Sequence, residues 1–263
     1  MPHYPDQLHR IVDLAERPKR IVSVVPSQTE LLFDLDLVDE IVGVTKFCVH
    51  PKEKVRIVMK IGGTKQLDIA KITDLKPDLI IANKEENDQQ QIEQLMELFP
   101  VWVSDIGDLN GAVEMIEIVG EMVGKTAEAK KLTDTIRQDF AGLLPLERKL
   151  RTAYFIWRNP YMVTGCNTFI DNMLSRCGFI NAFDQPRYPE IDGTLLRQAK
   201  PELILLSSEP YPFKEKHIEE LQAILPEAVI KLVDGEMFSW YGSRLLQAPG
   251  YFKQLLEVLS KSA

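Results

Sequence analysis

Short runs of β-branched and apolar residues recur along the chain and alternate with amphipathic stretches. Each run is only four to six residues long, which fits a strand buried on both faces by flanking helices. The strands predicted in this way are residues 20–25, 79–82, 101–104, 153–157, 203–206 and 229–233. Their alternation with helical patterns predicts an α/β protein with parallel sheets.

Two segments of the first half match two segments of the second half. The sequence LKPDLIIA at 75–82 parallels AKPELILL at 199–206, and IEQLMELFP at 92–100 parallels IEELQAILP at 218–226. The corresponding prolines are 124 and 126 residues apart, so the spacing between the two motifs is nearly preserved. We therefore predict two lobes of similar, Rossmann-like build. The alternative is that a helix, a Lys-Pro-acidic turn and a strand simply form a common α/β connection.

A long helical stretch lies between the halves. The apolar residues of 115–123 follow helical spacing, and a second run of the same kind follows it. Thr126 is predicted to cap this second helix and Pro145 to stop it. A helix over 127–143 would be about 25 Å long and would bridge the lobes. The predicted division is an N-terminal lobe at 1–107, a helical segment at 108–146 and a C-terminal lobe at 147–263.

The formal net charge of −8 disfavours a broad nucleic-acid surface and ionic attraction to an anionic membrane. No segment approaches the roughly 20 apolar residues of a membrane helix, and no secretory leader pattern is recognisable. The expected location is the cytoplasm, with the periplasm as the alternative if a leader has been removed. Three scattered cysteines, Cys48, Cys166 and Cys177, favour neither a disulfide framework nor a zinc knuckle.

Polar residues follow the predicted strands of the first half, at the ends where parallel α/β sheets bind ligands. Ser27 or Thr29 would cap a helix whose first N–H groups could meet a polar ligand. Cys48 and His50 could contact a soft metal from one side of a loop, although two ligands make no tight site and Cys48 could simply be buried. The candidate contacts are Ser27, Gln28, Cys48, His50, Thr64, Lys65, Glu85, Glu86 and Asn87. The alternatives are an ordinary helix cap, a surface turn at 61–65 and a solvated acidic loop.

Aromatic residues gather after the predicted strands of the second half, in the segments 157–161, 186–189 and 238–244. Trp and Tyr side chains supply flat contact area with a polar tip, and arginines pair with carboxylate, phosphate or amide oxygens. A single ring is more often part of a core, but three such clusters favour a flat ligand. The candidates are Trp157, Arg158, Tyr161, Tyr188, Trp240, Tyr241 and Arg244.

No catalytic motif is present. The four histidines are scattered, and no nucleophile elbow, zinc-protease or phosphate-loop pattern occurs. The expected role is therefore binding without bond chemistry, with no catalytic residue, no resident cofactor and no metal ligated directly by the protein. The alternative is an enzyme that modifies or delivers a corrinoid, metal or tetrapyrrole with Cys48, His50 and the Glu85–Glu86 pair.

Several motifs occur in an order that resembles a known family. They are KRIVSVVPSQTE at 19–30, IVGV at 41–44, GGT at 62–64, LKPDLI at 75–80 and the segment 165–182 with Gly178. The chain resembles the helical-backbone (class III) solute-binding proteins of iron-chelate and cobalamin ABC importers, and most of all their cobalamin-binding branch. The resemblance covers most of residues 8–255. It implies two α/β lobes joined by a single long helix, with the ligand held between them.

The resemblance also assigns individual positions. Phe47 stands where the cobalamin binders place an aromatic beside the corrin, and Tyr188 where they have a tryptophan. Thr64 replaces another tryptophan, which leaves the ligand open. The glutamates that dock those proteins on their transporter correspond to Ala70 and Thr194, with Asp68, Glu190 and Asp192 nearby. Without those glutamates, salt bridges to a transporter would be lost or altered.

Residues and resemblance together predict a monomeric solute-binding protein. It would reversibly bind a cobalamin-like corrinoid, or another metal chelate such as an iron siderophore or haem. Tyr161, Tyr188, Trp240 and Tyr241 would stack on the ligand, Phe47 would pack against it, and Arg158 and Arg244 would grip its polar groups. An ABC permease is the implied partner, although the docking carboxylates are missing. The alternatives are a cytoplasmic salvage enzyme and an intracellular sensor derived from the fold.

Overall fold

The computed structural model describes residues 2–261, which form two compact units. Unit 1 runs to Ile106 and adds Asn110–Arg137 and Tyr241–Leu246. Unit 2 comprises Gly107–Leu109, Gln138–Trp240 and the chain from Gln247 onward. Tyr241 and Arg244, which follow the last strand of the second half in sequence, thus belong to unit 1.

Unit 1 is built on a parallel sheet of five strands in the order β5-β4-β3-β8-β9. The strands are β3 (Ile21–Ser23), β4 (Ile41–Val44), β5 (Met59–Lys60), β8 (Leu79–Asn83) and β9 (Val101–Ser104). Every residue of β3, β8 and β9 is buried, as expected for strands with helices on both faces. A small hairpin of β6 (Gly62–Gly63) and β7 (Gln66–Leu67) follows β5.

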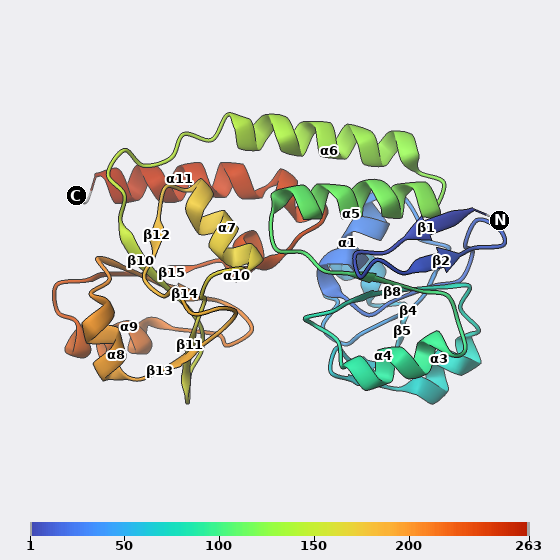
Figure 1. The fold of residues 1–263 in the computed structure, drawn as a ribbon, viewed down its shortest axis with the longest axis horizontal. Coiled ribbons are helices and arrows are strands. Elements are labelled where there is room, and N and C mark those ends of the chain that lie inside the picture. Colours follow the sequence, from blue (N-terminus) through green and yellow to red (C-terminus); the bar gives the residue numbers. More distant parts are fainter. Residues whose placement is uncertain (1, 262–263) are drawn as a thin grey trace. The chain divides into compact units, whose positions relative to one another are not determined.

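Helices cover both faces of this sheet. In Figure 1, α1 (Pro26–Asp34) and α5 (Leu109–Met122) lie on one side of the sheet, and α3 (Ile69–Leu75) and α4 (Gln89–Met96) lie on the other. A single turn, α2 (Lys52–Val55), lies between β4 and β5. The predicted cap of α1 by Ser27 or Thr29 is wrong. Pro26 starts the helix, Val25 is the N-cap residue without a side-chain cap, and Thr29 donates its hydroxyl to the Val25 carbonyl at 2.9 Å.

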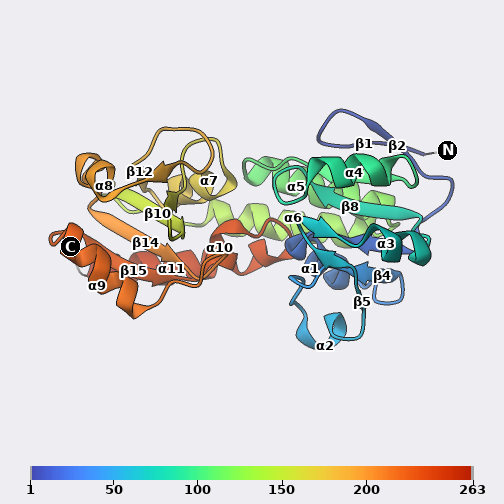
Figure 2. The same ribbon diagram turned by 90° about the horizontal axis from the view of Figure 1, so that it is seen from below.

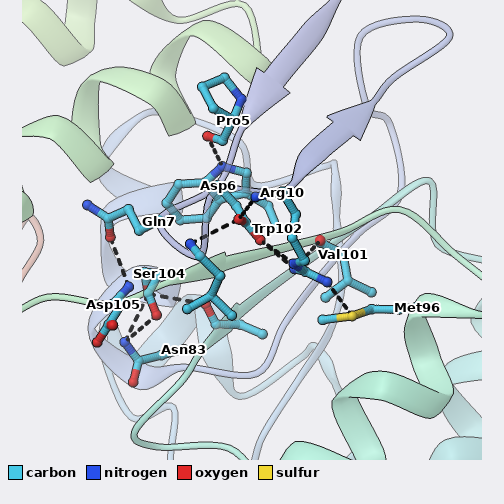
Figure 3. Close-up of polar contacts among 12 residues, drawn as sticks. Pro5, Asp6, Gln7, Arg10, Asn83, Met96, Val101, Trp102, Ser104 and Asp105 are labelled. Atoms are coloured by element: carbon cyan, nitrogen blue, oxygen red, sulfur yellow. Dashed lines mark hydrogen bonds and ion pairs between the residues drawn. The ribbon is translucent and has the colours of Figure 1, made fainter.

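An N-terminal arm is fixed on unit 1 (Figure 3). Its strands β1 (His3–Pro5) and β2 (Ile11–Asp13) pair with each other and flank a turn in which Asp6 is buried. The Asp6 carboxylate accepts hydrogen bonds from the backbone and guanidinium of Arg10. Trp102 of β9 donates its indole N–H to the Pro5 carbonyl at 3.1 Å. The arm therefore completes the core beside the edge strand β9.

Unit 2 is built on a mixed sheet in the order β13-β11-β10-β14-β15, with β12 also paired to β10. The strands are β10 (Arg151–Trp157), β11 (Tyr161–Val163), β12 (Ile180–Asn181), β13 (Glu190–Ile191), β14 (Leu203–Ser207) and β15 (Val229–Val233). Strands β10, β14 and β15 are parallel, as predicted, but β11 pairs antiparallel with both β10 and β13. The prediction of parallel strands did not include β11. Only three residues join β10 to β11, and so short a connection can form only an antiparallel hairpin.

The helices of the second half are α7 (Phe169–Arg176), α8 (Gly193–Ala199), α9 (Glu215–Ile224), α10 (Gly235–Ser239), the 3₁₀ turn η1 (Ser243–Leu246) and α11 (Ala248–Ser260). In Figure 1, α8 and α9 cover one face of the unit 2 sheet, where Leu196 and Leu221 pack on Phe155 and Ile204. The long helix predicted between the halves is α6 (Thr126–Ala141), which carries the chain from unit 1 into unit 2. None of the helices within residues 2–261 has the length and apolar character needed to span a bilayer.

The two segments matched in sequence adopt the same structure. Lys76 ends α3 and Lys200 ends α8, each with φ of 46° in the left-handed region. In unit 1, Arg20 donates from its guanidinium to the Leu75 carbonyl at 2.9 Å and from its backbone N–H to Asp78. In unit 2, the same bonds run from Arg151 to the Ala199 carbonyl and to the Glu202 carboxylate. The likeness therefore extends from sequence to individual hydrogen bonds.

Candidate functional site

The carboxyl end of the unit 1 sheet is a network of polar groups centred on Asn87. Its side-chain N–H groups donate to the carbonyls of Val24 and Thr64, each at 3.1 Å, and its side-chain oxygen accepts from the Asn83 N–H at 2.8 Å. Lys65 donates from its ammonium to the carbonyls of Glu85 and Asn87, at 2.7 and 3.1 Å. The loops after β3 and β8 and the turn between β6 and β7 are thereby tied together. The Asn87 side chain is buried, so it acts as a brace that holds these segments together.

Ser27 and Gln28 are also buried at this end. Gln28 donates its amide N–H to the Ser104 hydroxyl of β9 at 2.5 Å. The Ser27 hydroxyl and the Gln28 side-chain oxygen have no hydrogen-bond partner within residues 2–261. Both side chains lie in the first turn of α1, which no side chain caps. This turn therefore has hydrogen-bonding capacity in reserve, at the edge where parallel sheets bind ligands.

The three candidates in the loop after β4 differ in how exposed they are. Phe47 is 51% exposed, whereas Cys48 is buried and His50 is half-buried. The Cys48 thiol lies 3.1 Å from the Thr29 hydroxyl and 3.2 Å from the Thr45 hydroxyl. Burial raises the pKa of this thiol, so it stays protonated at neutral pH. Within residues 2–261, no three His, Cys, Asp or Glu side chains come together as a metal site would require.

Two candidates from the C-terminal part of the chain join unit 1. Arg244 of η1 makes a bidentate ion pair with Glu30 of α1, with N–O distances of 2.6 and 3.0 Å. Tyr241 donates its hydroxyl to the Glu86 carboxylate at 2.6 Å. Burial raises the pKa of Glu30, and Arg244 opposes that shift. Both candidates are buried and engaged with carboxylates of unit 1, which sequence position did not indicate.

In unit 2, Arg158 and Tyr161 flank the turn between β10 and β11 and meet Glu220 of α9. Arg158 makes a bidentate ion pair with Glu220, at 2.8 to 3.2 Å, and Tyr161 donates its hydroxyl to the same carboxylate. Burial and the bond to Glu220 raise the pKa of Tyr161 to about 12. Burial by itself would raise the pKa of Glu220, but the hydrogen bonds from Arg158 and Tyr161 prevail and lower it. The guanidinium predicted to grip the ligand is therefore held by a carboxylate.

Aromatic side chains surround this ion pair. Trp157, at the end of β10, is 40% exposed and makes an edge contact with Tyr211 at 5.8 Å between ring centroids. Tyr211 contacts Phe213 at 4.8 Å and His217 at 5.5 Å. His217 accepts the Lys214 backbone N–H on Nδ1, which places the proton of the neutral ring on Nε2, 3.3 Å from the Tyr211 hydroxyl. Trp157 is therefore an exposed ring on a packed aromatic base.

The remaining two aromatic candidates differ in their surroundings. Trp240 is buried and donates its indole N–H to Glu209 at 2.8 Å, beside the Ser239 hydroxyl at 2.7 Å. Burial raises the pKa of Glu209. Tyr188 is half-buried between β12 and β13. Of the six candidate rings, Trp157 and Phe47 are thus exposed, Tyr161 and Tyr188 are half-buried, and Trp240 and Tyr241 are buried.

Sequence reasoning missed Tyr211, His217 and Glu220. Tyr211 follows β14, so the rule that loops after parallel strands carry the site would have included it. Glu220 and His217 lie on a helix and are identified only by what they contact. Two of the three acidic residues near the missing docking glutamates have local roles instead. Asp68 caps α3 by accepting the Lys71 N–H, and Asp192 caps α8 by accepting the Thr194 and Leu195 N–H groups.

Two α/β units of repeated build, with polar and aromatic groups at the carboxyl ends of their sheets, define a solute-binding protein. The chain belongs to the periplasmic binding protein family, whose model matches residues 21–228. It is 28% identical over 263 residues to an uncharacterized ABC transporter substrate-binding lipoprotein, YvrC, of Bacillus subtilis, covering 92% of this chain and 81% of the relative. It is 24% identical over 243 residues to the vitamin B12-binding protein of Yersinia pestis, covering 89% and 85%.

Solved structures share the fold. The apo form of the periplasmic heme-binding protein RhuT from Roseiflexus superposes with a TM-score of 0.79 at 20% identity, covering 93% of this chain and 98% of that one. The vitamin B12-binding protein BtuF of Vibrio cholerae gives 0.74 at 22% identity, covering 93% and 99%. The molybdate-binding protein MolA of Haemophilus influenzae gives 0.80 at 16% identity, covering 100% and 92%. At these identities the likeness establishes the class III two-lobed fold and leaves the ligand open.

The expected cytoplasmic location is wrong. The family is that of periplasmic binding proteins, and one relative is a lipoprotein of an ABC transporter. These findings indicate a location outside the cytoplasm. The prediction relied on the lack of a recognisable leader, and that lack does not by itself distinguish the compartments, because exported proteins have their leaders cleaved.

Proposed function

We propose that this chain reversibly binds a planar metal chelate of the corrinoid or haem class and delivers it to an ABC permease. The observation that carries the proposal is the exposed Trp157 ring on its base of Tyr211 and Phe213, at the carboxyl end of the unit 2 sheet. A ring held in this way offers a flat apolar face at little entropic cost. Relatives that bind vitamin B12 and heme add support.

The alternative of a small oxyanion, as in the molybdate-binding relative, is less well supported. An oxyanion site needs cations or N–H groups that are free to turn to it. Arg158 is engaged by Glu220 and Arg244 by Glu30, both in bidentate geometry. Each pair leaves little net charge for an anionic guest. Stacking and hydrogen bonding to amide or propionate groups suit these surroundings better.

The proposal excludes bond chemistry at Cys48. A catalytic cysteine works as a thiolate in a partly exposed, electropositive setting. Cys48 is buried between two threonine hydroxyls, and burial raises its thiol pKa. We infer that the chelate is cargo and not a resident cofactor. The permease would have to bind without carboxylates at Ala70 and Thr194, because Asp68 and Asp192 are engaged as helix caps.

Calorimetric titration of the purified protein with cyanocobalamin, haemin, a ferric siderophore and molybdate tests the proposal. We expect saturable binding of one planar chelate and none of molybdate. Trp157→Ala should weaken that binding, whereas Trp157→Phe should largely preserve it. Binding of molybdate alone, or no binding across the panel, would overturn the proposal.

A further inference from the structure

One surface segment of unit 1 departs from the charge of the rest of the chain. Residues 46–60 follow β4 and contain α2 and the edge strand β5. The segment has a single acidic residue, Glu53, and five basic ones, namely Lys46, Lys52, Lys54, Arg56 and Lys60. The whole chain has a formal net charge of −8. The average over the chain, which disfavoured contact with an anionic surface, therefore conceals a local basic region.

The lysines and arginines of the 46–60 segment differ from many other cations of the chain in their surroundings. Within residues 2–261, none of the five forms an ion pair with a carboxylate. Lys71, Lys84 and Arg148 are among the cations outside the segment that do form such pairs. Lys46, Lys52, Lys54 and Arg56 are exposed, whereas Lys60 is half-buried and donates to the Val55 carbonyl at 3.0 Å. Four exposed cations thus lie in this segment, with Glu53 as its single acidic residue.

The same segment exposes apolar side chains. Ile57 is 77% exposed and Met59 52%, and Val49 is also exposed. Met59 lies on β5, the edge strand of the sheet, so its strand has a neighbour on one side only. In Figure 2, α2 lies at an extremity of unit 1, beyond β5. Exposed aliphatic tips among unpaired cations mark a contact surface.

We propose that the 46–60 segment is a peripheral contact with a bilayer of anionic phospholipids. Lysine and arginine stems extend over apolar surface while their charged ends reach headgroups, and aliphatic tips enter the boundary below. Protein interfaces, by contrast, are depleted of lysine at their centres. Three of the four exposed cations here are lysines, which suit a diffuse layer of phosphates better than a shaped protein pocket. The negative charge elsewhere on the chain would be repelled, so the contact would be confined to this segment.

The proposal is tested by co-sedimentation of the full chain with vesicles of pure phosphatidylcholine and with vesicles one-third of whose lipid is phosphatidylglycerol. We expect binding to the anionic vesicles only, and its loss as salt is raised. The triple substitution Lys52→Glu, Lys54→Glu and Arg56→Glu should weaken binding by at least about tenfold, since each basic residue near an anionic surface contributes appreciably. Ile57→Ser should weaken the component of vesicle binding that persists at high salt, because that component depends on apolar contact.

The matched control reverses three exposed lysines outside the segment, with Lys131→Glu, Lys149→Glu and Lys253→Glu. It changes the net charge equally and should bind vesicles like the unmodified chain. Circular dichroism of each variant separates lost contact from lost fold. Equal loss in both triple variants, or no sedimentation with either lipid, would overturn the proposal. Salt-resistant binding to a purified permease in neutral lipid, lost in the first triple variant only, would assign the segment to a protein partner and overturn it as well.

Discussion

Unit 1 and unit 2 are alike at one end of their sheets and different at the other. At the amino ends, Arg20 and Arg151 each donate to a helix carbonyl and to an acidic residue. The two acidic residues, Asp78 and Glu202, are 124 residues apart in the sequence. At the carboxyl ends, unit 1 has the buried Asn87 brace, whereas unit 2 has the Arg158–Glu220 ion pair and the exposed Trp157. The scaffold is thus repeated while the carboxyl ends of the two sheets have diverged.

This difference indicates separate tasks for the carboxyl ends of the two sheets. A brace of backbone hydrogen bonds holds loops in place and tolerates little change. An exposed ring on a packed base offers area to a ligand and depends less on its exact contacts for stability. Substitutions in unit 1 should therefore affect folding most, and those in unit 2 should affect binding most.

The largest effect is expected for Asn87→Ala. The change leaves the Val24 and Thr64 carbonyls and the Asn83 N–H without their partner in a buried site. We expect a loss of about 2–4 kcal/mol in the free energy of unfolding, measured in urea. Gln89→Ala, at the exposed start of α4, is the control and should change it by less than about 0.5 kcal/mol. A small loss for Asn87→Ala would mean that the loops of unit 1 hold without the brace.

A smaller effect is expected for ring removal. Under the proposed function, Trp157→Ala should lower chelate affinity about tenfold, because an exposed stacking ring contributes on the order of 1 kcal/mol. Phe47→Ala in unit 1 should lower the affinity less. Among the described residues, Phe47 makes no contact with another aromatic ring, so its ring is held less firmly than that of Trp157. Neither change should alter unfolding by much. A larger loss of affinity for Phe47→Ala would reverse the assignment of the ligand-binding end to unit 2.

A pH effect specific to unit 2 comes next. Burial and the charge of Lys216 lower the pKa of His217 from 6.5, so the unfolded chain binds more protons than the folded one below that pH. His217 therefore supports unit 2 fully above pH 6.5 and progressively less as the pH falls. In unit 1, burial raises the pKa of Glu30, which gives a dependence of opposite sign above pH 4.5. Urea unfolding from neutral pH downward should show a smaller acid loss in His217→Gln than in Tyr211→Phe, which retains the imidazole. If both variants lose the same free energy of unfolding as the pH falls, His217 is not the source of the acid loss.

The sequence was sufficient for the scaffold because short buried strands and repeated turns leave local patterns. All six predicted strands are present, and the matched motifs correspond in structure. It was insufficient for the site because pairing of side chains is not local. Arg158 meets Glu220 from 62 residues away, and Arg244 meets Glu30 from 214 residues away. Both arginines were therefore predicted as ligand contacts when carboxylates of the protein already engage them.

The smallest effect tests the likeness of the units directly. Lys76 and Lys200 adopt φ of 46° at equivalent helix ends, where a side chain with a Cβ is strained and glycine is not. Relief of that strain is partly offset by the greater freedom of glycine in the unfolded chain, so Lys76→Gly and Lys200→Gly should each stabilise by about 0.5 kcal/mol. The effects should be equal in size, and they should add in the double variant because the two sites share no partner. The controls Lys76→Ala and Lys200→Ala retain the Cβ and should give no gain. Opposite signs for the two glycine variants would show that the repeated turns differ in energy despite their common geometry.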